Sequence, residues 1–206
     1  MPVIDDVNLS PKTRVVIWEI NESFHDLKSK VVLSEYNLKL LNQKRSEIHK
    51  KQFLAIRKIF NLLFIDDEDL KYDKAGKPIC SQNKRLSISH SGNYAAVIMS
   101  DHSVGNDIET INDRILKIKS KYLETELNYP LELNTQTSLI YWNIKESVFK
   151  AVDKPGIDFK KNILVPPLDK KKNVVRSWYV DDDKIYSFDT RFKISKKYTL
   201  AFVIKN

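Results

Sequence analysis

Strand-forming segments occur in clusters along this chain, and that arrangement constrains the fold most. Runs of β-branched and aromatic residues appear at Arg14–Ile20, Tyr94–Met99 and Tyr198–Ile204. Turn residues rather than single helices separate several neighbouring runs, as the Asp181–Asp183 triplet does. This pattern predicts an α+β fold with small antiparallel sheets and argues against a doubly wound parallel sheet.

Two longer segments have helical periodicity. Apolar residues recur at close to a 3.6-residue period over Lys44–Leu63, and basic residues, among them Arg57, occupy the other face, which predicts an amphipathic helix with a solvated basic side. A second helix is expected over Asn134–Val152, with Asn134 as its N-cap and the Lys154–Gly156 turn after its end.

The order of strand, helices and strands occurs twice along the chain. We therefore expect two similar subdomains, residues 1–100 and 101–206, each a small antiparallel sheet with helices. No sequence repeat links the two halves.

Composition limits the class of protein. Lysine and arginine total 35 against 27 acidic residues, a net charge of +8, which favours a polyanionic or acidic partner, although solubility alone also explains it. The single Cys80 permits no intrachain disulfide and no zinc–thiolate site. The longest apolar run, Tyr94–Met99, is far shorter than a membrane span. The N-terminus lacks the apolar core of a signal peptide, so a cytoplasmic protein without a membrane segment is expected.

A pair of carboxylates marks the segment Gly105–Glu109. In a strand, the two-residue period places Asp107 and Glu109 on one face. Two converging carboxylates repel one another unless a cation lies between them, and oxygen ligands suit Mg²⁺, Mn²⁺ or Ca²⁺. Taken alone, this pair is more often a pair of exposed charges.

Three further segments carry chemistry. In the second helix Trp142, Glu146 and Lys150 share one face, and acid and base beside a tryptophan favour a functional surface over an ordinary helix ion pair. The segment Ser89–Ser91 presents His90, which can donate to phosphate or act as a base. The segment Gly76–Pro78 offers a turn with a lysine.

Together, in this order and spacing, the segments resemble the 4′-phosphopantetheinyl transferases, and the length of the chain is similar to that of the larger, surfactin-synthetase-activating class. The resemblance implies the fold of that family, with two subdomains related by a pseudo-twofold axis in a monomer. It implies the activity of a holo-[acyl-carrier-protein] synthase: Mg²⁺-dependent transfer of phosphopantetheine from coenzyme A to a serine of an acidic apo carrier protein, leaving 3′,5′-ADP. Mn²⁺ could replace Mg²⁺.

The resemblance also implies roles for individual residues. The metal would be held by Asp107, Glu109 and Glu146, and Lys150 would contact phosphate. Five residues would lie along the nucleotide: Gly76, Lys77, Pro78, Ser89 and His90. Arg57 matches best the family's basic residues at the 3′-phosphate, with His49 and Lys50 as alternatives. Asn106 departs from the small aliphatic residue that is usual between the glycine and the aspartate.

Two points stay open at the level of sequence. The base that accepts the serine proton is Glu146, directly or through a metal-bound water, or else His90. A metal-dependent nuclease and a basic nucleic-acid-binding module are the rival functions. Nuclease cores commonly place Glu and Lys two residues apart on a strand, not four apart on a helix, and a simple binding module leaves the carboxylates unexplained. No nucleic-acid partner is therefore expected.

Overall fold

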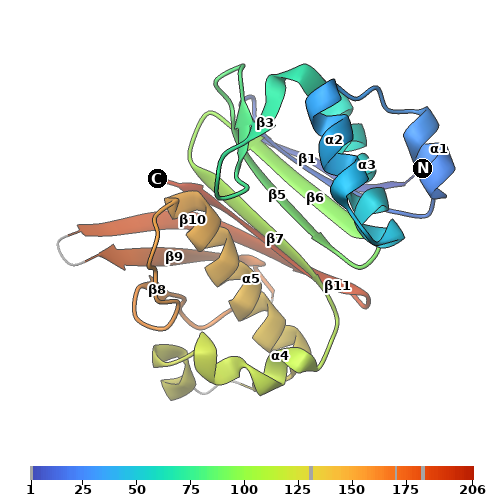
Figure 1. Ribbon diagram of the computed structural model, residues 1–206. Coiled ribbons are helices and arrows are strands. Elements are labelled where there is room, and N and C mark those ends of the chain that lie inside the picture. The colour runs from blue at the N-terminus through green and yellow to red at the C-terminus, as the bar shows by residue number, and fades with distance from the viewer. Residues whose placement is uncertain (1, 130–131, 170, 182–183) are drawn as a thin grey trace. The chain divides into compact units, whose positions relative to one another are not determined.

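The computed structural model describes residues 2–129, 132–169, 171–181 and 184–206 (Figure 1). It divides into two compact units, Met1–Asp101 and His102–Asn206. Each unit has its own hydrophobic core.

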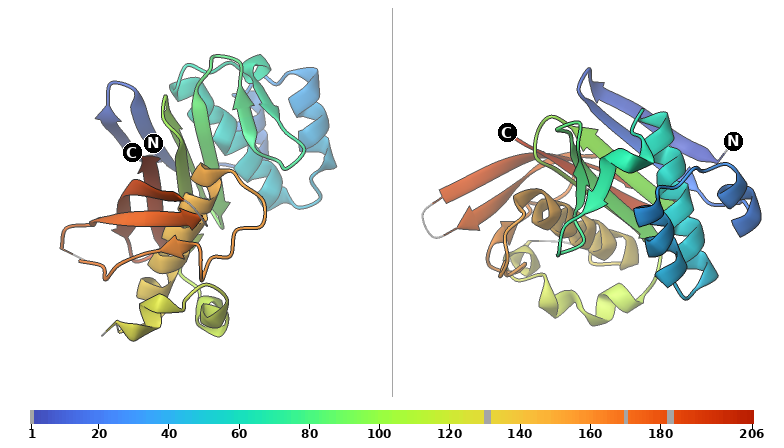
Figure 2. Two further views of the ribbon diagram at one scale, coloured as in Figure 1. Left: turned by 90° about the vertical axis from the view of Figure 1, so that its left-hand side faces the viewer. Right: turned by 45° about the horizontal axis from the view of Figure 1, so that its top comes forward.

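The first unit is built on an antiparallel sheet with the strand order β1-β2-β6-β5. Its strands are β1 (Val3–Ser10), β2 (Thr13–Glu19), β5 (Arg85–Ser91) and β6 (Tyr94–Ser100). Helices α1 (Phe24–Ser29), α2 (Glu35–Gln43) and α3 (Glu47–Leu62) lie on one side of this sheet (Figure 2), with α3 in contact with β2 and β6.

The three helices of this unit begin in the same way. Ser23, Ser34 and Ser46 are their N-caps, and each serine side chain accepts a hydrogen bond from the main-chain N–H three residues later. Such a cap satisfies one of the N–H groups that a helix start leaves without an intrahelical partner. The serines therefore set where these helices begin.

A short hairpin follows the 3₁₀ turn η1 (Asp67–Asp69) and consists of β3 (Leu70–Tyr72) and β4 (Pro78–Cys80). In its turn, Asp73 Oδ1 accepts hydrogen bonds from the main-chain N–H groups of Ala75 and Lys77. Gly76 has a φ of 84°, which glycine adopts without the strain of a side chain. The turn residues predicted here are thus confirmed.

The second unit contains an antiparallel sheet with the order β7-β11-β10-β9-β8. Its strands are β7 (Val104–Thr110), β8 (Ile163–Leu164), β9 (Val174–Asp181), β10 (Lys184–Ile194) and β11 (Tyr198–Lys205). Helix α5 (Thr135–Val152) packs on β7 and β11 (Figure 2), and short turns connect β7 to it: α4 (Arg114–Lys117), η2 (Lys119–Lys121) and η3 (Thr125–Asn128). Asn134 caps α5 as predicted.

The two units share one strand pairing. In each, the strand before the long helix pairs antiparallel with the last strand of the unit: β2 with β6, and β7 with β11. The predicted α+β class with antiparallel sheets is confirmed, whereas the pseudo-twofold relation of the halves stays a prediction. None of the helices in the described part of the chain is long and apolar enough to cross a bilayer.

The sequence did not predict β1, and it predicted a strand only over Lys184–Asp189 where β10 is found. Polar residues interrupt β1 and face solvent, so the segment lacks an apolar run. Strand β10 extends to Ile194 because it pairs with β11 along its C-terminal part. Positions 182 and 183 of the predicted Asp181–Asp183 turn lie outside the described residues.

Candidate functional site

Strand β7 and helix α5 carry the predicted carboxylates and lysine of the second unit, and the structure joins the two elements there. Lys150 Nζ donates to Asp107 Oδ1 at 2.7 Å and to the main-chain oxygen of Asn106 at 2.9 Å. The Asp107 side chain is 6% exposed and that of Lys150 is 27% exposed. A lysine from the helix therefore anchors the first carboxylate of the strand.

Glu146, one helical turn before Lys150, shares the electrostatic environment of the strand carboxylates. The pKa of its carboxyl is raised from 4.5 to about 7, first by burial and then by the negative charges of Asp107 and Glu109, while Lys150 opposes the rise. The three acidic groups thus interact, which the strand and helix periodicities alone could not establish.

Gly105 explains how α5 comes so close to β7. A Cβ atom at this position would lie 1.8 Å from the main-chain oxygen of Ser147 and 3.1 Å from the nitrogen of Ala151. Both of these atoms belong to the backbone of the helix, which a side-chain rotation cannot move away. The glycine of the Gly105–Glu109 segment is therefore a helix-packing residue.

Replacing Gly105 by alanine is expected to lower the free energy of unfolding by about 1–3 kcal/mol, because the helix must shift from the strand. Urea unfolding monitored by circular dichroism measures the loss. Gly156→Ala is the matched control, since its added methyl group would have no atom within 4 Å and only its positive φ of 75° costs energy, about 1 kcal/mol. A loss at Gly105 no larger than at Gly156 would contradict the packing role.

The residues predicted to lie along a nucleotide belong to the first unit. Gly76 and Lys77 are in the β3–β4 turn and Pro78 begins β4, while Ser89 and His90 are on β5. Strand β4 contacts β5, so the unit brings the two segments into neighbouring elements. His90 is exposed and Ser89 is buried. Their roles stay predictions.

The structure corrects the prediction that Arg57 belongs to a solvated face. Its residue surface is 1% exposed, and its guanidinium donates to Asn37 Oδ1 at 2.7 Å and to Asp67 Oδ1 at 3.3 Å. The guanidinium also lies 3.5 Å from the centre of the Phe53 ring. Periodicity placed this residue on the polar face, but hydrogen bonds and a cation–π contact offset the cost of burying its charge.

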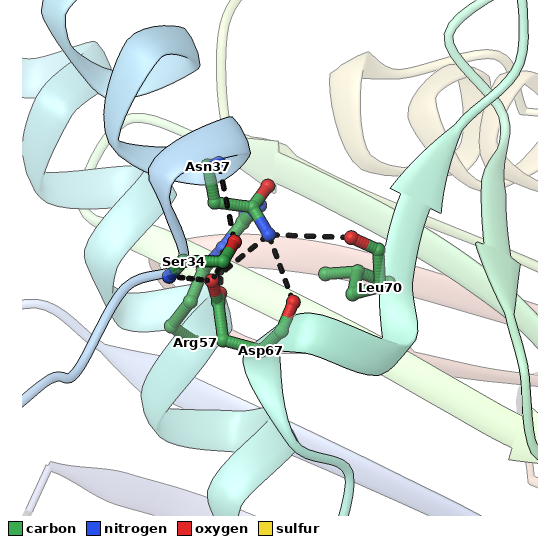
Figure 3. Close-up of polar contacts among 5 residues, drawn as sticks. All are labelled: Ser34, Asn37, Arg57, Asp67 and Leu70. Carbon is green, nitrogen blue, oxygen red and sulfur yellow. Dashed lines mark hydrogen bonds and ion pairs between the residues drawn. The ribbon is translucent and has the colours of Figure 1, made fainter.

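Figure 3 shows how this buried cluster ties three segments together. Asp67 Oδ2 accepts from the N–H and hydroxyl of Ser34 and from Asn37 Nδ2, and Asn37 Nδ2 also donates to the oxygen of Leu70. Arg57 is consequently a structural residue that links α3 to the start of α2 and to η1. Its predicted contact with a 3′-phosphate stays a prediction.

Lys145, the neighbour of Glu146, has a structural position that the sequence analysis did not foresee. Both Lys145 and Glu126 have fully buried side chains, and they form an ion pair with Nζ 2.8 Å from Oε1. Lys145 Nζ also donates to the main-chain oxygens of Phe159 and Ile163, at 2.8 and 2.7 Å. The adjacent residues Lys145 and Glu146 thus have different roles. Lys145 holds the loop before β8, and Glu146 belongs to the acidic site.

The donor set is suited to a hard divalent cation by its chemistry. Asp107, Glu109 and Glu146 offer oxygen atoms only, and their mutual repulsion is what a cation would relieve. Among the residues that the structure describes, however, no group of three or more His, Cys, Asp or Glu side chains forms a ready-made metal cluster. This combination fits Mg²⁺, which usually binds one or two carboxylates together with waters and substrate phosphates, better than it fits an all-protein cage.

Comparison with known proteins gives a match over about half of the chain. No protein-family model matches the chain. The 4′-phosphopantetheinyl transferase gsp of Aneurinibacillus migulanus is 33% identical to it over 109 residues, which are 49% of this chain and 46% of that protein. The match thus spans about half the length of this curated relative. It supports a relationship to the phosphopantetheinyl transferase superfamily over about half of the chain.

Proposed function

We propose that this protein transfers the 4′-phosphopantetheine group of coenzyme A to a serine hydroxyl of an apo carrier protein, as a member of the larger, surfactin-synthetase-activating class. The similarity to a curated phosphopantetheinyl transferase carries this proposal. The acidic set on β7 and α5, with Lys150 beside it, supports it because a pyrophosphate substrate needs both a cation and a lysine.

In the proposed site, Asp107, Glu109 and Glu146 would hold Mg²⁺ or Mn²⁺. When bound, the metal supplies positive charge that neutralises the pyrophosphate and so improves 3′,5′-ADP as a leaving group. Lys150 has three N–H donors, of which Asp107 and Asn106 take two, so the remaining donor can reach a phosphate oxygen. These residues orient the phosphorus that the carrier serine attacks.

The proton of the serine hydroxyl must leave as the oxygen attacks phosphorus. Glu146 is the proposed acceptor, because a positioned carboxylate of this site can take up the proton. The oxygen–phosphorus bond to the carrier forms while the bond to 3′,5′-ADP breaks. His90 is the alternative base.

The first unit would contribute the nucleotide contacts. Gly76, Lys77, Pro78, Ser89 and His90 are the proposed contact residues, with Arg57 as the proposed link to the 3′-phosphate. Positive charge and hydrogen-bond donors in these segments suit the anionic groups of coenzyme A.

The proposed carrier is acidic. The chain has a net charge of +8, and Arg114, Lys117, Lys119 and Lys121 are exposed in and beside α4, within the unit that carries the acidic site. Complementary charges accelerate the encounter of two proteins. This segment is the proposed contact surface for the carrier.

Incubation with coenzyme A, Mg²⁺ and an apo carrier protein tests the function directly. Mass spectrometry should show the carrier gaining one phosphopantetheine group, and EDTA should abolish the gain. Asp107→Asn should also abolish it, whereas Asp169→Asn, a matched change at an exposed carboxylate of the same unit, should not. An unmodified carrier would refute the proposed function, and full transfer in EDTA would refute the metal.

A further inference from the structure

Asn143 is a fully buried polar residue of α5 that the sequence analysis did not single out. Its Nδ2 donates to the main-chain oxygen of Asp107 at 3.2 Å and to that of Thr199 at 3.0 Å. Both acceptors are carbonyl oxygens, so the amide must turn its NH₂ group toward them. One side chain thus joins the helix to two neighbouring strands, β7 and β11.

Helix α5 makes a second polar contact with β11 at Ser147, one helical turn after Asn143. The single hydrogen of the Ser147 hydroxyl is shared between the main-chain oxygen of Asn143, at 2.6 Å, and that of Ala201, at 3.1 Å. Four residues advance a helix by about 6 Å, and two residues advance a strand by about 6.8 Å. Asn143 and Ser147 therefore lie against the alternate β11 carbonyls of Thr199 and Ala201 without a break in register.

These contacts fix where Glu146 stands along β7. In the sheet, Thr199 pairs with Glu109 and Ala201 pairs with Asp107. Asn143 bonds the helix segment that contains Glu146 to this same stretch of sheet, and Ser147 lies against it at the other end. Glu146 is thereby held level with the two strand carboxylates.

Stability alone does not explain an asparagine at this position. Asn143 Oδ1 is buried and has no hydrogen-bond partner among the described residues. A buried acceptor left without a partner costs free energy, which offsets part of what the two hydrogen bonds of Nδ2 contribute. The amide therefore has a task other than filling the core.

We propose that Asn143 is a positioning residue that sets Asp107 and Glu109 against Glu146 for binding the divalent cation. It acts through the backbone of the strands and touches neither substrate nor metal. The inference rests on the proposed function, since it concerns the same acidic site. It adds a residue that holds the ligands in place, of the kind whose loss typically weakens metal binding by about 10–100-fold.

The test measures Mn²⁺ binding by electron paramagnetic resonance in the presence of coenzyme A, with coenzyme A alone as the blank. Asn143→Leu keeps the volume but removes two hydrogen bonds, so it should lower the urea midpoint and also weaken Mn²⁺ affinity at least about tenfold. Asn143→Ala is the second variant, in case leucine does not pack.

Asn37→Ala is the matched control. Asn37 is also fully buried, and its amide also donates to two main-chain oxygens, those of Asp67 and Leu70, but it belongs to the first unit. This variant should lose stability and, at a saturating concentration of coenzyme A, retain the parent's Mn²⁺ affinity within about twofold. The Asn143 variants should thus lose Mn²⁺ affinity, whereas Asn37→Ala should keep it.

The possible outcomes test the positioning role of Asn143 and the metal role of the site separately. If the Asn143 variants bind Mn²⁺ as tightly as Asn37→Ala does, the positioning role is wrong while the proposed function stands. If the parent protein binds no Mn²⁺ beyond the blank, the metal role fails and the inference fails with it. Recovery of carrier modification by Asn143→Leu at raised Mn²⁺ would support a weakened metal site over a damaged fold.

Discussion

Glu146→Gln is expected to abolish carrier modification and at the same time to make the metal-free protein more stable at neutral and alkaline pH. Glutamine keeps the shape of the side chain but removes its charge and its ability to accept a proton. Loss of a general base costs about 10²–10⁴-fold in rate, and loss of a metal ligand adds to it. We therefore expect turnover to fall at least about 100-fold.

The stability gain follows from the raised pKa of the Glu146 carboxyl. The folded protein holds this proton up to about pH 7, mainly because of burial and then of the charges of Asp107 and Glu109, while the unfolded chain releases it near 4.5. The contribution of this group is complete below pH 4.5 and is lost as the pH rises through 7. Above pH 7, Glu146→Gln should stabilise the fold by up to about 3 kcal/mol.

Urea unfolding in EDTA at pH 5 and pH 8 measures this effect. The parent should be less stable relative to Glu146→Gln at pH 8 than at pH 5. Glu132→Gln, at an exposed glutamate of the same unit, should not change the difference. If Glu146→Gln destabilises the protein at pH 8, the three carboxylates do not repel one another as the structure indicates.

Lys145→Met is expected to have the largest effect on stability, lowering the free energy of unfolding by about 3–5 kcal/mol. The substitution leaves the buried carboxylate of Glu126 without its cation and removes the donor of two main-chain oxygens, those of Phe159 and Ile163. An uncompensated buried charge is far more costly than a lost surface pair. Chemical denaturation measures the loss.

A second substitution separates charge from packing. Glu126→Gln in the Lys145→Met background removes the stranded charge and should restore much of the lost stability. Lys154→Met is the matched control, because Lys154 pairs with Asp181 on the surface, with side chains 46% and 37% exposed, and should cost less than about 1 kcal/mol. Equal losses at Lys145 and Lys154 would be incompatible with a buried ion pair.

Local patterns predicted the elements that carry the site. Alternation in the Gly105–Glu109 segment indicated a strand with both carboxylates on one face, and the periodicity after Asn134 indicated the helix that bears Glu146 and Lys150. These signals are visible in sequence because the residues that produce them are neighbours along the chain. Strand β1, which was missed, has no continuous apolar run and gains its structure from pairing with another strand.

The individual roles of charged residues were harder to predict. Arg57 and Lys145 each lie in a helix with at least one other basic residue that is not buried, and nothing adjacent to them in sequence distinguishes them. Arg57 is buried because Asn37 and Asp67 come from other segments, and Lys145 is buried because Glu126 lies under the same helix. Burial of a charge depends on partners that are distant along the chain.

The sequence by itself determined the α+β class, the strand with its paired carboxylates, the capped helix and the set of residue types from which a metal-dependent transferase is inferred. Only the tertiary structure decided that Gly105 lets α5 approach β7, that Lys150 reaches Asp107, and that Asn143 bonds both strands. The physical reason is the separation along the chain over which each kind of interaction acts. Periodicity and capping act over a few residues, whereas close packing and buried hydrogen bonds join atoms more than 30 positions apart, here 36 for Asn143 and Asp107.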